Sequence, residues 1–293
     1  MELREAQQHT FETILGQDLA KRFLVRACEQ ESLPHALMLT GPDGVGKQSL
    51  MFSFAKHMVS RHFEPESEAA RKATGKVERG THPDVMVVMP KTASGQILKS
   101  QVEEMHERAH FAPLEAPCKI ILISPIEAMN VVAANDLLKL LEEPPPSLYI
   151  LVCTEHIHQV LTTIRSRCAL LRCPPVELET LAEWLTQVGR CSKRRAHTAA
   201  ALSGGRPGLA FELLGGDNEE RRRRLTGELE LFNREGYASI FRVAHNLLLA
   251  GGNDPGETLE LLITWYRDLM VAGLLGPQEA DDLGLLVNRD LTD

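Results

Sequence analysis

The chain has 293 residues, of which 43% are hydrophobic and 25% charged, and its net charge is −8. This balance is typical of a globular protein with roughly two domains of about 150 residues, and the acidic total excludes a generally basic nucleic-acid binder. The six cysteines form no C-x-x-C pair, so neither a zinc site nor a disulfide framework is supported. Without a signal peptide or an apolar run of about 18 residues, we expect a cytoplasmic protein with no membrane contact.

Short apolar runs in the first 175 residues predict five strands, at 36–40, 85–89, 119–123, 149–154 and 168–172. Each run is nearly continuous in hydrophobicity, as expected for strands that are buried on both faces of a sheet.

Helical patterns lie between these runs. We expect helices at 47–61, at 100–110 with a capping box of Ser100 and Glu103, and at 135–143 before three prolines. Strands that alternate with helices predict an α/β fold with a doubly wound parallel sheet. In such sheets ligands bind at the carboxyl ends of the strands.

The pattern becomes purely helical in the second half of the chain. We predict three domains, an α/β domain at 1–175, a small helical domain at 176–216 and an all-α domain at 217–293. In a helix at 257–275, the side chains of Leu262, Trp265 and Leu269 share one face. Such an apolar stripe suits a helical bundle, and it fits an internal core and a contact with a neighbouring subunit equally well.

The segment GPDGVGK at 41–47 matches the phosphate-binding pattern G-x-x-x-x-G-K, and it lies between a predicted strand and a predicted helix. Three glycines allow the backbone N–H groups to turn toward a phosphate. They are Gly41, Gly44 and Gly46. Lys47 would contact the phosphate oxygens, but the next position, which normally supplies a hydroxyl to Mg²⁺, is Gln48. We therefore predict a vestigial phosphate loop with no bound nucleotide, while weak nucleotide binding through Lys47 and the loop stays an alternative.

The residues after the strand at 119–123 support this interpretation. Hydrolysis needs an acid at the end of a second strand to hold the metal, and usually another to activate water. Ser124 and Pro125 stand at these places, and Glu127 is the nearest carboxylate. Ser49 lies one position too late, so that its side chain points about 100° further round the helix. We predict no ATP hydrolysis and no metal site, while rearranged metal ligands from Ser49 and Glu127 stay an alternative.

Several motifs follow one another in an order that is typical of one family. They are PHALMLTGPDGVGK (34–47), GTHPDV (80–85), NDLLKLLEEPP (135–145), IRSRC (164–168) and TWYRDLM (264–270). With them the chain resembles the bacterial DNA polymerase III clamp loader, an AAA+ assembly, and most of all the delta-prime subunits of that family. The resemblance extends over most of the chain and is densest over 10–175. LLKLLEEPP followed by S-R-C is quite specific to clamp loaders.

The resemblance implies an AAA+ fold, with an N-terminal P-loop domain followed by a helical lid and a helical collar. The ATP-binding gamma/tau subunits keep the Mg²⁺ hydroxyl and the second-strand acids, whereas delta-prime proteins lose them. A further loss agrees, because Gly208 stands where active members carry a nucleotide-sensing arginine, and Arg206 is out of register. The losses therefore favour the delta-prime type.

The segment Ser166-Arg167-Cys168 remains intact. The resemblance implies that Arg167 acts in trans, as an arginine finger toward ATP that a neighbouring subunit holds, with Ser166 and Cys168 as its motif neighbours. A guanidinium suits this role because it matches phosphate oxygens and stabilises the charge that develops in phosphoryl transfer. Arg165 is a weaker candidate for supporting contacts. Taken alone, Arg167 also fits an ordinary surface salt bridge.

Two departures from the family pattern matter. Relatives often carry a four-cysteine zinc module before GTHPD, but the interval 57–79 has no cysteine. His57, His62 and His82 cannot replace four thiolates, so we predict no zinc, and we expect the polar stretch 64–80 to be mobile. The collar is also shorter than the resemblance implies, and a naturally short collar and a truncated sequence both stay open.

These observations together predict a non-hydrolysing subunit of a clamp-loading ring within a DNA-directed DNA polymerase holoenzyme. The partners that the resemblance implies are gamma/tau-type ATPase subunits, the delta subunit and, through the complex, the sliding clamp and primed DNA. ATP is expected on the neighbouring subunit, and no cofactor on this chain. Two alternatives stay open, an active AAA+ ATPase of the gamma/tau type and a degenerate AAA+ scaffold outside replication.

Overall fold

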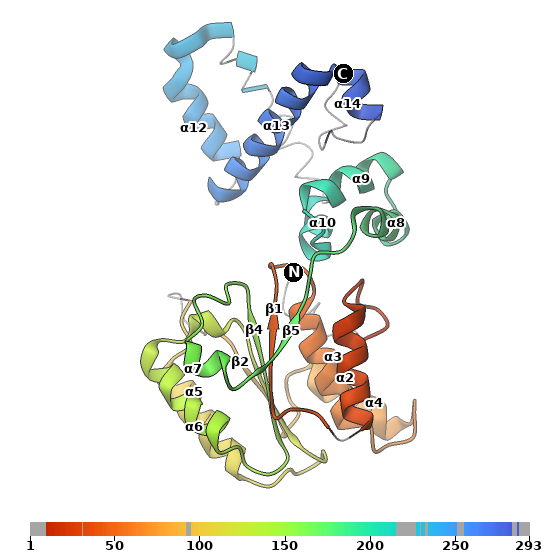
Figure 1. The fold of residues 1–293 in the computed structure, drawn as a ribbon, viewed down its shortest axis with the longest axis vertical. Helices are drawn as coiled ribbons and strands as arrows, with labels where there is room; N and C mark the ends of the chain where they lie inside the picture. The colour runs from red at the N-terminus through yellow and green to blue at the C-terminus, as the bar shows by residue number, and fades with distance from the viewer. Residues whose placement is uncertain are drawn as a thin grey trace. The chain divides into compact units, whose positions relative to one another are not determined.

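A computed structural model describes residues 10–30, 32–91, 95–214, 227–228, 230–231, 234–250, 255–282 and 286. The chain divides into two compact units, Met1–Val176 and Glu177–Asp293. The first unit holds the β-sheet, and the described part of the second is helical (Figure 1). The predicted domain boundary at 216/217 lies outside the described residues, so the division into three domains stays a prediction.

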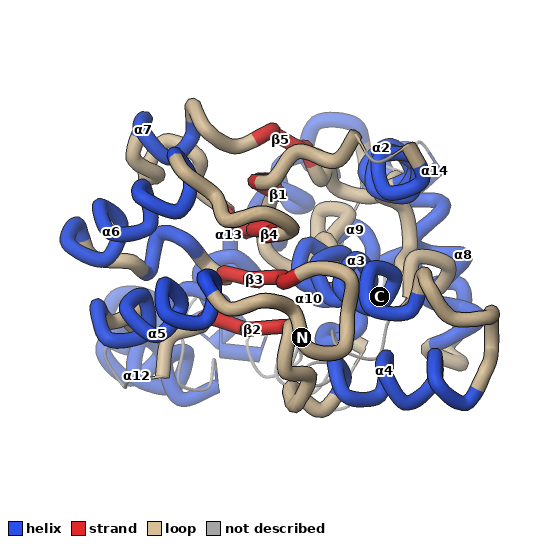
Figure 2. The backbone as a smooth tube through the Cα atoms, turned by 90° about the horizontal axis from the view of Figure 1, so that it is seen from below, coloured by secondary structure: helices blue, strands red, loops and turns tan. Residues whose placement is uncertain are grey.

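Five strands form the sheet: β1 (Ala36–Thr40), β2 (Val85–Val88), β3 (Lys119–Ile123), β4 (Leu148–Thr154) and β5 (Ala169–Arg172). Their order across the sheet is β2-β3-β4-β1-β5, and every pairing is parallel. Parallel strands need crossover connections, and the helices of these connections cover both faces (Figure 2). The α/β fold class and the five predicted strands are thus confirmed, with ends that differ by one residue at β2, β4 and β5.

Each face of the sheet has its own set of helices and its own hydrophobic core (Figures 1 and 2). One face carries α2 (Asp18–Glu29), α3 (Lys47–Ser60) and α4 (Glu68–Glu78), and the other carries α5 (Lys99–His110), α6 (Val131–Glu142) and α7 (Thr162–Arg165). Successive strand residues face opposite sides. In β1, Leu37 and Leu39 join the core under α2 and α3, while Met38 joins the core under α5 and α6.

Two of the predicted helix starts were wrong, because side chains other than the expected ones make the hydrogen bonds of the first turn. The Asn130 side chain accepts a hydrogen bond from the Ala133 N–H at 2.9 Å, and α6 therefore begins four residues before the predicted start. At α5, the predicted box of Ser100 and Glu103 does not form. The Gln101 side chain instead accepts the N–H of Leu98, the residue before the helix, at 3.1 Å.

The polar stretch 64–80, which we expected to be mobile, contains the helix α4. Ser67 caps its first turn by accepting the N–H of Ala70 at 3.2 Å. Ala70, Ala73 and Val77 are buried, and their spacing of three and four residues places them on one helix face. Because small alanine side chains contribute little to a hydrophobic pattern, this face was missed in the sequence.

The second unit contains α8 (Leu178–Val188), α9 (Lys193–Leu202), α10 (Pro207–Leu213), α12 (Ile240–Ala250), α13 (Pro255–Leu275) and α14 (Pro277–Asp282). On α13, Leu262 and Trp265 are half-buried, whereas Leu269 is exposed, and so are Ile263 and Met270. The predicted apolar stripe is therefore only partly buried within the chain. None of the helices in the described ranges combines the length and the apolar character that crossing a membrane requires.

Candidate functional site

The glycine loop after β1 has the backbone of a phosphate loop. Gly44 and Gly46 have φ values of +77° and +98°, in the left-handed region that favours glycine. Gly41 is needed for another reason. A Cβ atom at this position would lie 2.1 Å from the carbonyl oxygen of Cys173, just after β5. The close approach of two chain segments therefore requires Gly41 whether or not a nucleotide binds.

Lys47 is bound by its own loop. Its side chain is buried, and Nζ donates to the carbonyl oxygens of Gly41 and Pro42, both at 2.7 Å. The remaining cavity beside the loop has a volume of about 170 Å³, below the range of about 300–1,000 Å³ that is typical of small-molecule pockets. The cradle predicted from the glycines and Lys47 is thus present, but the ammonium already has two acceptors from the loop.

Gln48 and Ser124, which stand where the loop hydroxyl and the strand-end acid are expected, contact each other. Gln48 is the second residue of α3, Ser124 directly follows β3, and Gln48 Nε2 donates to Ser124 Oγ at 3.2 Å. In an active site of this class, Mg²⁺ lies between a loop hydroxyl and a strand-end acid at these two places. Here an amide and a hydroxyl, both neutral, satisfy each other instead.

Glu127, the nearest carboxylate, binds the backbone of the turn after β4. Its Oε1 accepts the N–H groups of Glu155 at 2.7 Å and His156 at 2.9 Å, and also the hydroxyl of Thr154. Partial burial opposes ionisation, but the hydrogen bonds from His156 and Thr154 prevail and lower the pKa of the Glu127 carboxyl. The carboxylate therefore fixes the turn after β4. Neither Glu127 nor the buried Ser49 lines the cavity at the loop, which disfavours the alternative with rearranged metal ligands.

The segment Ser166-Arg167-Cys168 joins α7 to β5. Ser166 Oγ donates to the carbonyl oxygen of Thr163 at 3.1 Å, which closes the end of the short helix. Cys168 packs against the core under α5 and α6, and burial raises the pKa of its thiol to about 11, so that it acts as an apolar anchor. The two neighbours thus hold the backbone on either side of Arg167, whose side chain is 36% exposed.

Arg167 makes two contacts within the chain. Nη1 donates to the Thr163 carbonyl oxygen at 2.9 Å, and Nη2 lies 2.8 Å from Oε1 of Glu142, the last residue of α6. The simpler interpretation from the sequence, a surface salt bridge, therefore describes this arginine in the single chain. Arg165 lies half-buried in α7, and the contact with Glu142 was not foreseen.

Arg167 and the phosphate loop lie at opposite edges of the sheet. The loop follows the carboxyl end of β1, and Arg167 precedes the amino end of β5, which pairs with β1 in parallel. The five residues of β1 span about 16 Å at a rise of roughly 3.3 Å each. This separation exceeds the length of an arginine side chain, so Arg167 cannot reach a phosphate in its own loop.

A second functional-looking motif, GTHPDV, has a structural role in the chain. Asp84 is 3% exposed, and its two carboxylate oxygens accept three backbone N–H groups, from Leu114 at 2.8 Å, Glu115 at 2.7 Å and Ala116 at 2.9 Å. These bonds fix the segment that leads from α5 into β3. The sequence marked Asp84 only as part of a motif, because its partners lie some 30 residues further along the chain.

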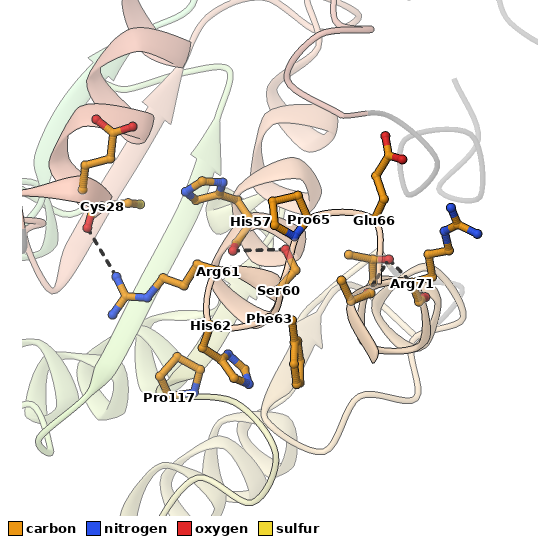
Figure 3. A pocket seen from close by; sticks show the side chains of 13 residues that line it. Cys28, His57, Ser60, Arg61, His62, Phe63, Pro65, Glu66, Arg71 and Pro117 are labelled. Carbon is orange, nitrogen blue, oxygen red and sulfur yellow. Dashed lines mark hydrogen bonds between the residues drawn. The ribbon is translucent and has the colours of Figure 1, made fainter. Parts of the chain in front are cut away.

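A pocket of about 960 Å³ lies at the ends of α2 and α3, where relatives were expected to carry a zinc module. Figure 3 shows Arg61 reaching from the end of α3 to the carbonyl oxygen of Cys28, with a hydrogen bond of 3.3 Å. Burial raises the pKa of the Cys28 thiol to about 11 and lowers the pKa of His57, which also lines the pocket. The thiol of Cys28 therefore stays protonated, so Cys28 and His57 do not form an activated nucleophile. Within the described ranges, no three His, Cys, Asp or Glu side chains are grouped to hold a metal ion.

Comparison with known proteins agrees with the motifs and the fold. Residues 16–177 match the family model described as "DNA polymerase III, delta subunit". DNA polymerase III subunit delta' of Pseudomonas aeruginosa is 32% identical over 254 residues, which is 86% of this chain and 75% of that protein. The delta' subunit of Escherichia coli is 27% identical over 65% of this chain and 58% of its own length. The delta' subunit of Bacillus subtilis is 31% identical over 57% of this chain and 50% of its own length.

Among solved structures, the RuvB Holliday junction branch migration motor of Thermotoga maritima has the same fold, with a TM-score of 0.51 at 15% identity. The match covers 97% of this chain and 87% of the RuvB chain. At this identity the likeness concerns the fold alone. The family model and the Pseudomonas relative, by contrast, cover enough of the chain to assign it. The chain belongs to the family of DNA polymerase III delta' subunits.

Proposed function

We propose that the chain is the delta'-type subunit of a replicative clamp loader, that it does not hydrolyse ATP, and that it provides Arg167 to ATP on a neighbouring subunit. The observation that supports the absence of ATP hydrolysis is the hydrogen bond between Gln48 and Ser124. It occupies the place of the metal with two neutral groups, and without Mg²⁺ the charge that develops on the transferred phosphoryl group has no counter-ion.

The trans role of Arg167 is supported by its position. Its side chain is partly exposed at the sheet edge opposite to its own phosphate loop. An arginine there can stabilise a transition state only if another chain brings the phosphate to it. The flanking contacts of Ser166 and Cys168 hold the backbone at this place, as preorganised electrostatic stabilisation requires.

The partners follow from the family. Relatives of this chain include DNA polymerase III subunit tau of Bacillus subtilis, which is 31% identical over 54% of this chain. Similar folds in one complex favour neighbours of gamma/tau type, which we propose as the ATP-binding partners. The delta subunit, the sliding clamp and primed DNA complete the proposed assembly. With a net charge of −8, the chain is expected to meet DNA mainly through that complex.

Co-purification tests the assignment to a loader. When the full-length chain is mixed with its cognate gamma/tau-type and delta subunits, we expect one complex in size-exclusion chromatography that loads the clamp onto primed DNA. Omission of the chain should abolish loading. If the complex forms and loads clamps equally well without it, the chain is a scaffold outside replication.

Calorimetric titration of the purified chain with ATP tests the inactive site. We expect no Mg²⁺-dependent binding, because the two positions that would hold the metal carry an amide and a hydroxyl. The double variant Gln48→Thr/Ser124→Asp restores both ligand types and is a control for gained Mg²⁺ dependence. Micromolar, Mg²⁺-dependent affinity of the unmodified chain, with ATP turnover abolished by Lys47→Ala, would instead identify an active ATPase.

A further inference from the structure

We infer that Glu142 is a positioning residue that holds the guanidinium of Arg167 on its own chain and releases it when the phosphate of a neighbouring subunit is engaged. This inference rests on the proposed function of Arg167. The contact that carries it is the 2.8 Å approach of Arg167 Nη2 to Glu142 Oε1, together with the hydrogen bond from Nη1 to Thr163.

The position of Glu142 argues that the pair is more than an accidental surface contact. Glu142 ends α6, and Glu143 caps it, so two carboxylates lie at the negative end of the helix dipole, where acids are unfavourable. A residue that goes against such a local preference of the helix is found mostly where it has a functional role. Arg167 supplies the positive charge that offsets the unfavourable placement of Glu142.

A carboxylate and a phosphate compete for the same face of a guanidinium. Both bind the planar fork of donors through paired oxygens, and in this chain both terminal nitrogens of Arg167 already have acceptors. To meet a phosphate with its full charge, the side chain must exchange the carboxylate oxygen of Glu142 for phosphate oxygens. The side chains of Arg167 and Glu142 are 36% and 50% exposed, so the exchange of oxygens costs little. The ion pair therefore weakens the binding of Arg167 to the phosphate without preventing it.

The test is Glu142→Gln in the reconstituted loader, with Glu143→Gln as the matched control. Glu143 is adjacent and exposed, and its carboxylate forms no ion pair with any described residue. We expect Glu142→Gln to raise ATP hydrolysis in the absence of clamp and DNA by about two- to fivefold, the range of an exposed ion pair. Raising the salt concentration should stimulate the unmodified loader and not the variant. Glu143→Gln should leave the rate unchanged.

A double-mutant cycle separates this inference from the function on which it rests. If Glu142 acts through Arg167, Glu142→Gln has no effect in an Arg167→Ala background. An effect that persists there, or an unchanged or lowered rate for Glu142→Gln alone, overturns the inference. If Arg167→Ala itself leaves hydrolysis unchanged, the proposed function fails first. In the single chain, Glu142→Gln should also speed the modification of Arg167 by phenylglyoxal, as measured by peptide mass spectrometry, and equal rates would contradict the ion pair.

Discussion

Replacement of Arg167 by alanine is expected to reduce ATP hydrolysis at the neighbouring site of the loader by about 10³-fold or more, the effect of removing an arginine finger in phosphoryl-transfer enzymes. In the proposed role, the guanidinium stabilises charge in the transition state, and this stabilisation is lost in the variant. Folding is expected to survive, because the side chain is 36% exposed. Single-turnover hydrolysis by the reconstituted complex measures this effect, and steady-state clamp loading should fall with it. Binding of ATP to the complex should change much less, since the interaction is strongest in the transition state.

The chain offers a matched control for this variant. Arg172 is exposed at the carboxyl end of β5, so Arg172→Ala removes the same charge at the opposite end of the strand that Arg167 precedes. It should leave hydrolysis at the neighbouring site within about twofold, as is usual for a surface charge. Arg167→Lys keeps the charge without the planar fork and should stay defective. Unchanged turnover for Arg167→Ala, or equal losses for Arg167→Ala and Arg172→Ala, would reject the finger.

The sheet could be predicted from the sequence because its strands are buried on both faces. Runs such as 119–123 are apolar at almost every position, and this is a strong local signal. The starts of α5 and α6 could not be predicted equally well. They depend on single hydrogen bonds that the side chains of Gln101 and Asn130 accept from the backbone, and several residues of the sequence could have made such bonds.

The candidate site, too, has features that could be predicted from the sequence and features that could not. The absence of metal ligands could be seen in the sequence, because it depends on residue identity at Gln48 and Ser124. That these two residues bond to each other could not, since they are 76 residues apart. The pairing of Arg167 with Glu142 was hidden for the same reason. Contacts between distant residues follow from packing, and a single sequence does not report them.

The retained glycines also acquire a physical explanation. A phosphate loop without nucleotide chemistry, as we propose for this chain, could be expected to lose its glycines as well. Gly41 cannot be replaced freely, because the carbonyl oxygen of Cys173 approaches it closely, and Gly44 and Gly46 adopt positive φ values in the turn into α3. The requirements of the fold thus preserve the shape of the nucleotide site independently of nucleotide binding.

Replacement of Asp84 by alanine is expected to destabilise the first unit by on the order of 4 kcal/mol, because three backbone N–H groups lose a buried, charged acceptor. The N–H groups belong to Leu114, Glu115 and Ala116, and the carboxylate that accepts them belongs to a residue that is only 3% exposed. Urea unfolding of the full chain, followed by circular dichroism, measures the change as a lower midpoint with an unchanged slope.

The control for this prediction is Asp18→Ala, which removes a carboxylate that is 72% exposed and pairs with Lys21 at 3.1 Å. An exposed pair contributes little, so this variant should lose less than about 1 kcal/mol. Asp84→Asn should fall between the two, because its amide oxygen can accept hydrogen bonds from this segment while its NH₂ group faces donors. Equal stabilities for Asp84→Ala and Asp18→Ala would contradict the role of Asp84. If stability falls as expected while Arg167-dependent hydrolysis survives in the folded fraction of the variant, GTHPDV acts through the fold.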